Sequence, residues 1–284
     1  MTASTSLTVM RNLKNILILL IFVCLVLPAS TVLAATNTVC GSLKVAFYEH
    51  GALYYKNISG DYTGIDKDII DELAHRTGCQ FEISLESRVR IWSQMEKNVL
   101  DISVSAIEIP EREKYAYFIN YITARNYALL QNDVPVRAQT MAGFLANPSL
   151  TVAVVKSFRH GVIFDAWLDK LRLENRVHEV ADFRSLFRVF KAHRVDAIIA
   201  LPISWGQLTV KEEFLENARI FDWASNDKFD AGLVISKKRV DKKIFELLQK
   251  AMQEMNEDGT TEAIFKRHIS SSIAHELVLE KYKH

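Results

Sequence analysis

The stretch DISVSAIEIPER, from Asp101 to Arg112, determines how the rest of the chain is interpreted. Its apolar half predicts a short strand that ends near Ile107, and Pro110 breaks that strand. Free backbone N–H groups and serine hydroxyls at a strand end can bind an anion, and the guanidinium of Arg112 adds a planar, two-pronged donor. The pattern therefore indicates a site for a carboxylate, with an ordinary strand and a surface arginine as the open alternative.

Strands and helices alternate on both sides of this stretch. Such alternation predicts an α/β fold with mostly parallel sheets and crossover helices. The expected strands are residues 43–48, 81–85, 100–107, 126–130, 151–155, 176–180, 195–201, 219–223 and 229–235. The expected helices are residues 67–77, 89–98, 162–173, 184–193, 202–215, 241–255 and 260–268. Asp66 is the expected N-cap of the first helix and Gly78 its C-terminal stop, and the tail from Ser270 to His284 is expected to be peripheral.

Residues 1–34 have the composition of a cleavable signal peptide. Arg11 and Lys14 precede an apolar run over residues 16–27, and small residues follow it up to Ala34. A retained membrane anchor is the alternative, but the run is short for a span of about 20 residues. We therefore expect secretion, and a periplasmic mature protein.

The charge balance argues against nucleic-acid binding. The whole chain has 35 Lys and Arg against 34 Asp and Glu, a net charge of +1. Loss of the leader would remove two positive charges, so the mature chain has no basic excess for nucleic acid or an anionic membrane.

Two cysteines remain outside the leader. Cys40 and Cys79 each stand just before an expected strand, so they would lie side by side if those strands are parallel neighbours. In an oxidising compartment this predicts a disulfide, with two reduced and buried thiols as the alternative.

Four short motifs occur in an order and at a spacing that resemble a known family. They are GSLKVA at residues 41–46, GIDKDI at residues 64–69, IPER at residues 109–112 and HRVDA at residues 193–197. With these motifs the chain resembles the family 3 periplasmic solute-binding proteins, of the polar amino-acid-binding type. The resemblance implies a two-lobed, type II periplasmic-binding-protein fold. Lobe 1 would comprise residues 40–131 and 228–269 and lobe 2 residues 132–227, with crossings near residues 130–134 and 227–231.

The same resemblance implies a ligand site between the lobes. Arg112 would pair with the ligand carboxylate, while Ser105 and Ile107 would face the same group, largely through backbone atoms. The implied aromatic wall and second-lobe positions are Tyr48, Tyr54, Ser157 and Leu201.

Leu201 stands where the family often has an acid that binds the ligand's α-amino group. A buried cation without a partner is costly, so we hypothesise a ligand that keeps a carboxylate but lacks the usual α-amino contact. Candidates are a keto acid, a dicarboxylate or an amino-acid derivative, with Asp227 or Asp230 as a substitute acid.

The implied function is capture of a small carboxylate ligand for an inner-membrane ABC permease. We expect a monomer without a cofactor, a metal site or catalytic residues. His50, His160, His178 and His193 are interpreted as surface or loop residues. Two alternatives stay open: a binding subunit that reports to a membrane sensor, and a prephenate-type dehydratase in which Glu108 would be the acid.

Overall fold

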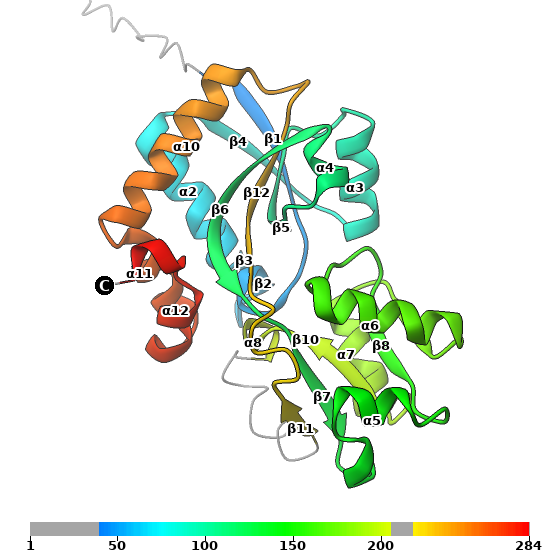
Figure 1. Cartoon of the computed structure of the whole chain (residues 1–284). Coiled ribbons are helices and arrows are strands. Elements are labelled where there is room, and N and C mark those ends of the chain that lie inside the picture. The colour runs from blue at the N-terminus through cyan, green and yellow to red at the C-terminus, as the bar shows by residue number, and fades with distance from the viewer. Residues whose placement is uncertain (1–39, 206–217, 284) are drawn as a thin grey trace, which may run out of the picture. The chain divides into compact units, whose positions relative to one another are not determined.

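The computed structural model describes residues 40–205 and 218–283 (Figure 1). The proposed signal peptide, and the expected helix 202–215 beyond Trp205, lie outside these residues. The strands gather into two five-stranded sheets and a small hairpin.

The first sheet is built from the two ends of the described chain. Its spatial order is β4 (Gln80–Leu85), β1 (Ser42–Phe47), β5 (Ile102–Ile107), β12 (Phe229–Ser236) and β6 (Ala116–Ala124). β1 pairs in parallel with β4 and β5, while β12 is antiparallel to both β5 and β6. The strand expected over residues 100–107 is therefore central in this sheet, and its residues from Ile102 to Ala106 are all buried.

The second sheet lies in the middle of the sequence. Its order is β11 (Ala218–Phe221), β7 (Tyr127–Gln131), β10 (Ala197–Ala200), β8 (Val152–Val155) and β9 (Val177–Val180). β8 is parallel to β9 and β10, and β7 is antiparallel to both of its neighbours. The four residues of β10 are all buried, as expected for an apolar strand covered on both faces.

In each sheet, one strand is antiparallel to the other four. In both sheets this strand comes directly after the chain has passed from one sheet to the other. The chain passes after β6 and enters as β7, and it returns after β11 as β12. The expected first crossing at residues 130–134 is too late in the chain, because β7 pairs with β10 and β11. An ion pair links the two passages, with Arg125 Nη2 3.2 Å from Asp222 Oδ2.

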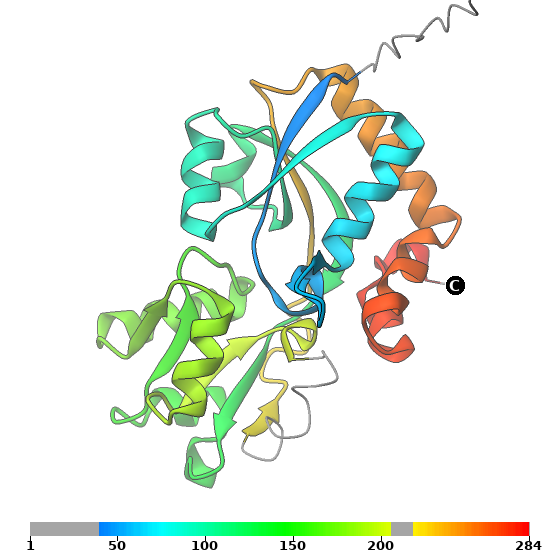
Figure 2. The same cartoon turned by 180° about the vertical axis from the view of Figure 1, so that it is seen from behind.

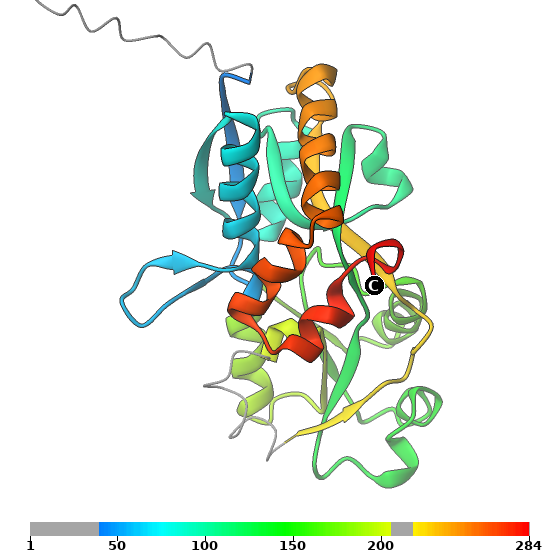
Figure 3. The same ribbon diagram turned by 90° about the vertical axis from the view of Figure 1, so that its left-hand side faces the viewer.

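Helices cover both faces of the first sheet (Figures 1 and 3). α2 and α10 lie side by side on one face, with α11 packed on both, while α3 and α4 lie on the other. Their bounds are α2 Ile65–Thr77, α3 Arg88–Glu96, α4 Pro110–Glu113, α10 Lys242–Glu257, α11 Thr260–His268 and α12 Ser271–Leu277.

The start of α2 differs from the prediction, whereas its end agrees. Gly64 is the N-cap, with φ 139°, and a Cβ there would strike the Leu53 carbonyl. Asp66 lies inside the first turn with its carboxylate fully buried. Gly78 ends the helix in the left-handed conformation, with its N–H donating to the Ala74 carbonyl.

The second sheet is covered by α6 and α7 on opposite faces (Figure 2). The bounds here are α5 Met141–Leu145, α6 Val162–Leu173, α7 Phe183–Lys191 and α8 Pro202–Trp205. The remaining elements are the hairpin of β2 (Tyr55–Lys56) and β3 (Tyr62–Thr63), and the short turns η1 (Gly51–Leu53), η2 (Val136–Ala138) and η3 (Glu280–Tyr282).

The C-terminal tail is part of the core, which corrects its expected peripheral position. α12 packs on α11 and β6, and Ala274 and Leu277 are buried in the same cluster as the first sheet. The tail lacks a long apolar run, so its sequence gave little sign of this role.

Cys40 and Cys79 form a disulfide with Cα atoms 5.1 Å apart. The parallel pairing of Ser42 with Gln80 aligns the two chain segments at one edge of the sheet. The predicted pairing and its structural reason are therefore both confirmed.

Candidate functional site

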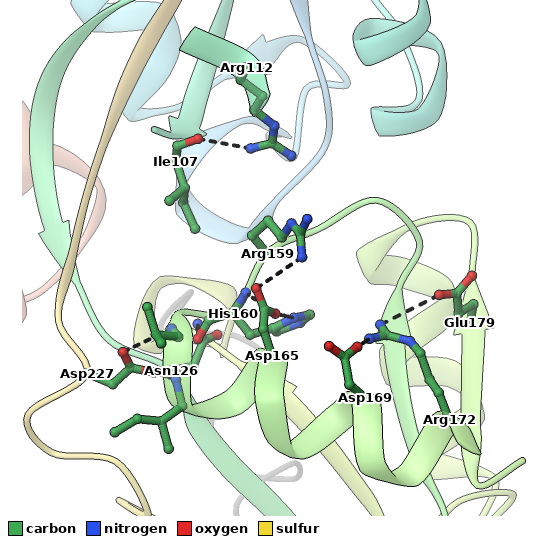
Figure 4. Close-up of polar contacts among 12 residues, drawn as sticks. Ile107, Arg112, Asn126, Arg159, His160, Asp165, Asp169, Arg172, Glu179 and Asp227 are labelled. Atoms are coloured by element: carbon green, nitrogen blue, oxygen red, sulfur yellow. Dashed lines mark hydrogen bonds and ion pairs between the residues drawn. The ribbon is translucent and has the colours of Figure 1, made fainter. Parts of the chain in front are cut away.

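Arg112 is a buried cation in α4, at the end of the first sheet that faces the second (Figure 4). Only 6% of the residue is exposed, and its Nη1 donates to the Ile107 carbonyl at 3.0 Å. Its guanidinium carbon lies 3.5 Å from the ring centre of Trp92. Burial, aided by nearby Arg88, lowers the pKa of Arg112 to about 9, which leaves it charged at neutral pH. No carboxylate within the described ranges pairs with it.

Arg88 is a second buried cation beside the first. It is the first residue of α3 and is 3% exposed. Its guanidinium carbon lies 4.3 Å from the Tyr48 ring centre, 5.0 Å from that of Trp92 and 5.9 Å from that of Phe158. Its Nε and Nη1 have no hydrogen-bond partner in the described part of the chain. Buried donors in native proteins are nearly always satisfied, so these two make Arg88 a candidate contact for a ligand acceptor.

Aromatic rings from both sheets pack around these cations. His50, after β1, stacks on Phe183 of α7 with ring centres 3.5 Å apart. The His50 Nε2 lies 2.7 Å from the Ser204 hydroxyl of α8, and Phe158 meets the imidazole edge-on. Burial and the charge of Arg88 lower the pKa of His50 well below its ordinary value, so the ring is neutral.

A buried carboxylate closes the site on the α2 side. Ser105 has φ 48°, and its hydroxyl donates to both oxygens of Asp66, at 2.8 and 2.9 Å. The Tyr121 hydroxyl donates to Asp66 Oδ1 at 2.7 Å. Burial raises the pKa of Asp66 to about 7, although the hydrogen bonds from the Tyr121 and Ser105 hydroxyls oppose the change.

A cavity of about 490 Å³ opens between the sheets next to Arg88. Its lining comes from the ends of β1 and β4, from the start of α3, and from β8 and α7 of the second sheet: Tyr48, Glu49, Leu85, Glu86, Ser87, Arg88, Arg90, Val155, Ala181, Asp182, Phe183 and Arg184. Arg112 is not among these residues, but its guanidinium packs on the same Trp92 ring as that of Arg88. A cavity of this size suits a small organic molecule.

The structure brings together four of the site residues expected from sequence. Arg112 binds the Ile107 carbonyl, and the Tyr48 hydroxyl donates to the Ser105 carbonyl at 3.1 Å. Ser105 thus presents its carbonyl to Tyr48 and turns its hydroxyl to Asp66.

The other three expected residues lie elsewhere. Tyr54 stacks between Phe47 and Tyr62 and lines an adjoining cavity of about 700 Å³, which shares Glu49, Phe183 and Arg184 with the first. Ser157 is exposed, with φ 65°, and Leu201 is 5% exposed in the hydrophobic core. Whether these residues contact a ligand stays a prediction.

The candidate acids have structural partners. Asp227 accepts hydrogen bonds from the Val162 and Ile163 N–H groups, which caps α6. Asp230 accepts one from the Thr123 hydroxyl. Glu108, the acid considered for dehydration, is exposed.

Sequence reasoning missed Arg88 and two of the histidines. His50 and His160 lie in loops, in line with their interpretation as surface or loop residues, but they are only 1% and 2% exposed, whereas His178 and His193 are exposed. The spacing of Arg88 and Trp92, four residues apart on one helix, was the available signal. The orientation of α3 toward the second sheet is a tertiary feature that the local sequence does not reveal.

Neither a cluster of metal ligands nor a membrane-spanning helix occurs among the described residues. No three His, Cys, Asp or Glu side chains within residues 40–205 and 218–283 gather as metal ligands. Among the helices in these ranges, none is long and apolar enough to cross a membrane.

Comparisons with known proteins agree with this architecture. The family model for bacterial extracellular solute-binding proteins, family 3, matches residues 43–271. A comparison with curated protein sequences gives no match.

Three of the similar solved structures show the shared fold. A mutant of ArgBP from T. maritima is 19% identical with a TM-score of 0.67, and the match covers 80% of this chain and 95% of that one. An ancestral amino acid-binding protein, a precursor of cyclohexadienyl dehydratase, is 20% identical with a TM-score of 0.65, covering 81% and 96%. The substrate-binding protein of an amino acid ABC transporter is 16% identical with a TM-score of 0.65, covering 80% and 99%.

Proposed function

Because the chain belongs to the bacterial extracellular solute-binding proteins, family 3, we propose that it binds a small carboxylate-bearing ligand between its two sheets. The observation that carries this proposal is Arg112, a buried guanidinium with no carboxylate partner in the described ranges. A buried unpaired cation is expensive, so a site that keeps one is suited to an anion.

The surroundings of Arg112 support binding with precise orientation. The Ile107 carbonyl and the Trp92 ring hold the guanidinium from two sides. Its remaining N–H groups can then meet the two oxygens of a carboxylate in the bidentate geometry that arginine favours. Aromatic rings around this point exclude water, which strengthens the attraction between the charges.

Contacts between the sheets suggest how binding is coupled to closure. His50 of the first part of the chain reaches Phe183 and Ser204 of the second. Two bodies joined by two short chain passages can open and close around a ligand, as in hinged binding proteins. A ligand that contacts both bodies would shift the equilibrium toward the closed arrangement, by an amount set by the difference between its affinities for the closed and open forms.

We place the mature protein in the periplasm, after removal of residues 1–34, as a monomer that passes its ligand to an inner-membrane ABC permease. The substrate-binding protein of an amino acid ABC transporter shares this fold, and that likeness supports the proposed role. We propose binding without turnover, since the candidate acid Glu108 is exposed rather than held beside Arg112.

A thermal-shift screen of the mature protein tests the proposal. The panel pairs amino acids with their keto and dicarboxylate counterparts, and it compares wild type with Arg112→Ala. The control is Arg137→Ala, which removes the same charge from an exposed position in η2. A ligand at 100 times its Kd stabilises by about 2.7 kcal/mol, which is readily detected.

The expected result is a shift with at least one acid that disappears in Arg112→Ala and persists in Arg137→Ala. A shift of equal size in all three proteins, or none with any acid, would contradict the proposed carboxylate site.

A further inference from the structure

Arg88 provides a second set of buried donors close to Arg112. Its Nε and Nη1 lack partners within the described residues, and so does the Nε1 of Trp92. Arg88 is 3% exposed and lines the cavity of about 490 Å³, so these donors are not satisfied by bulk solvent. A ligand acceptor beside Arg88 would satisfy several of them together.

The two guanidiniums are close enough for one small molecule to reach both. Their central carbons lie 3.5 and 5.0 Å from the same Trp92 ring centre. Two like charges held near one ring repel each other, and an anion at only one of them would leave the other unpaired. A molecule with an anionic group at each end would neutralise both.

Within the described residues, each carboxylate beside the pair or in the cavity lining already has a partner, including Glu86 with Arg90 and Asp182 with the Ser185 N–H. On the α2 side, Asp66 already accepts bonds from Ser105 and Tyr121. At the cavity rim, Glu49 accepts a bond from the Tyr62 hydroxyl and pairs with Arg184.

The second sheet offers the same pattern. Asp165 accepts a bond from the His160 N–H and lies 3.5 Å from Arg159, whose guanidinium faces Arg112 in Figure 4. Asp227 caps α6. On this side Arg159 therefore adds a cation near Arg112, while Asp165 and Asp227 are already paired.

We infer that the ligand is a small dicarboxylate without an ammonium group, with one carboxylate on Arg112 and the other on Arg88. This inference rests on the proposed function and narrows its ligand class. Arg88 selects the second carboxylate because its side chain lines the cavity and two of its buried donors have no partner within the described residues.

Isothermal titration with matched acids tests the second carboxylate and the missing ammonium separately. Glutarate against pentanoate changes only the second carboxylate, and 2-oxoglutarate against L-glutamate exchanges a keto group for the ammonium. Succinate and adipate vary the distance between the carboxylates. The proteins are wild type, Arg112→Ala, Arg88→Met, Arg88→Lys and the exposed control Arg137→Met.

We expect wild type to bind at least one diacid at least tenfold more tightly than pentanoate, and 2-oxoglutarate at least tenfold more tightly than L-glutamate. Arg88→Met should abolish the preference for the diacid while retaining binding to pentanoate, and Arg137→Met should leave both unchanged. If Arg88→Met does not fold, as judged by circular dichroism, Arg88→Lys should retain the charge and weaken only the diacid.

Two results would overturn the inference while leaving the proposed function intact. One is equal affinity for glutarate and pentanoate with both dependent on Arg112. The other is tighter binding of L-glutamate than of 2-oxoglutarate. Loss of all Arg112-dependent binding would instead refute the proposed function itself.

Discussion

The imidazole of His50 and the ring of Phe183 stack with centres 3.5 Å apart and planes inclined by 7°. One ring follows the first strand of one sheet, and the other begins a helix that covers the second sheet. This stack is therefore a direct link between the two halves of the site. Several measurable properties depend on it and on its neighbours.

Replacing the stacked pair should reveal energetic coupling between the sheets. We expect His50→Ala and Phe183→Ala each to lower the free energy of unfolding, with a coupling of about 1 kcal/mol in the double variant. Chemical denaturation of the four proteins in the cycle measures it. His50→Ala combined with Leu173→Ala, whose side chain is 86% exposed, should be additive. Additivity at the stacked pair as well would show that the contact contributes nothing.

Asp66 should make stability fall as the pH rises toward neutrality. Its folded pKa is about 7 against an ordinary 3.8, so the folded state binds the proton more tightly. The stabilisation is full below about pH 4 and is lost as the pH rises through 7, a change of roughly 4 kcal/mol. The buried histidines have the opposite effect, because their lowered pKa values reduce stability in acid. Subtracting the curve of stability against pH of Asp66→Asn from that of wild type removes their contribution.

The measurement is urea denaturation between pH 4 and pH 8.5. Asp71→Asn is the control, because this residue is on the same helix and half exposed. A constant difference between wild type and Asp66→Asn over this range would contradict the raised pKa.

Breaking the disulfide should destabilise the first sheet edge. The bond joins residues 39 positions apart, and the loop-entropy estimate gives about 4 kcal/mol. Cys40→Ser, Cys79→Ser and the double variant should show equal losses in thermal unfolding, and reductant should lower the Tm of wild type only. A reductant effect on the double variant would disprove this assignment of the stabilising bond.

Substitutions at two glycines with positive φ distinguish the cost of backbone strain from the cost of a steric clash. Gly51 has φ 48°, and a Cβ there would strike the backbone of Ile203, whereas Gly60 has φ 87° and open space. Gly60→Ala should cost about 1 kcal/mol of stability from conformation alone. Gly51→Ala should cost clearly more, because it also separates η1 from α8. Equal losses in denaturation would mean that the close approach is not needed.

The local elements were predictable because their signals are local. Helix 162–173 was predicted with the same bounds as α6, and Gly78 marked the end of α2. The parallel order around β1 followed from strand and helix alternation, and it correctly predicted the Cys40–Cys79 bond.

The misplaced features depend on contacts that are distant in sequence. The choice of sheet for β7 is decided by pairing with β10 and β11, which lie far along the chain. The burial of His50 requires Phe183, and the inward carboxylate of Asp66 requires Tyr121. Arg112 could be identified from the sequence because it is part of a recognisable motif. Arg88 could not, because the aromatic rings around it come from three separate segments of the chain.

The placement of β12 between β5 and β6 has a consequence for biosynthesis. All strands of the second sheet are contained in residues 127–221, so this sheet can assemble as soon as that span has left the ribosome. The first sheet is synthesised largely before it, yet its central gap is filled only when residues 229–236 emerge. Until then β5 and β6 expose pairing edges, which are prone to wrong association. If the chain is exported before it folds, as we propose, the first sheet can be completed only after residues 229–236 have crossed the membrane.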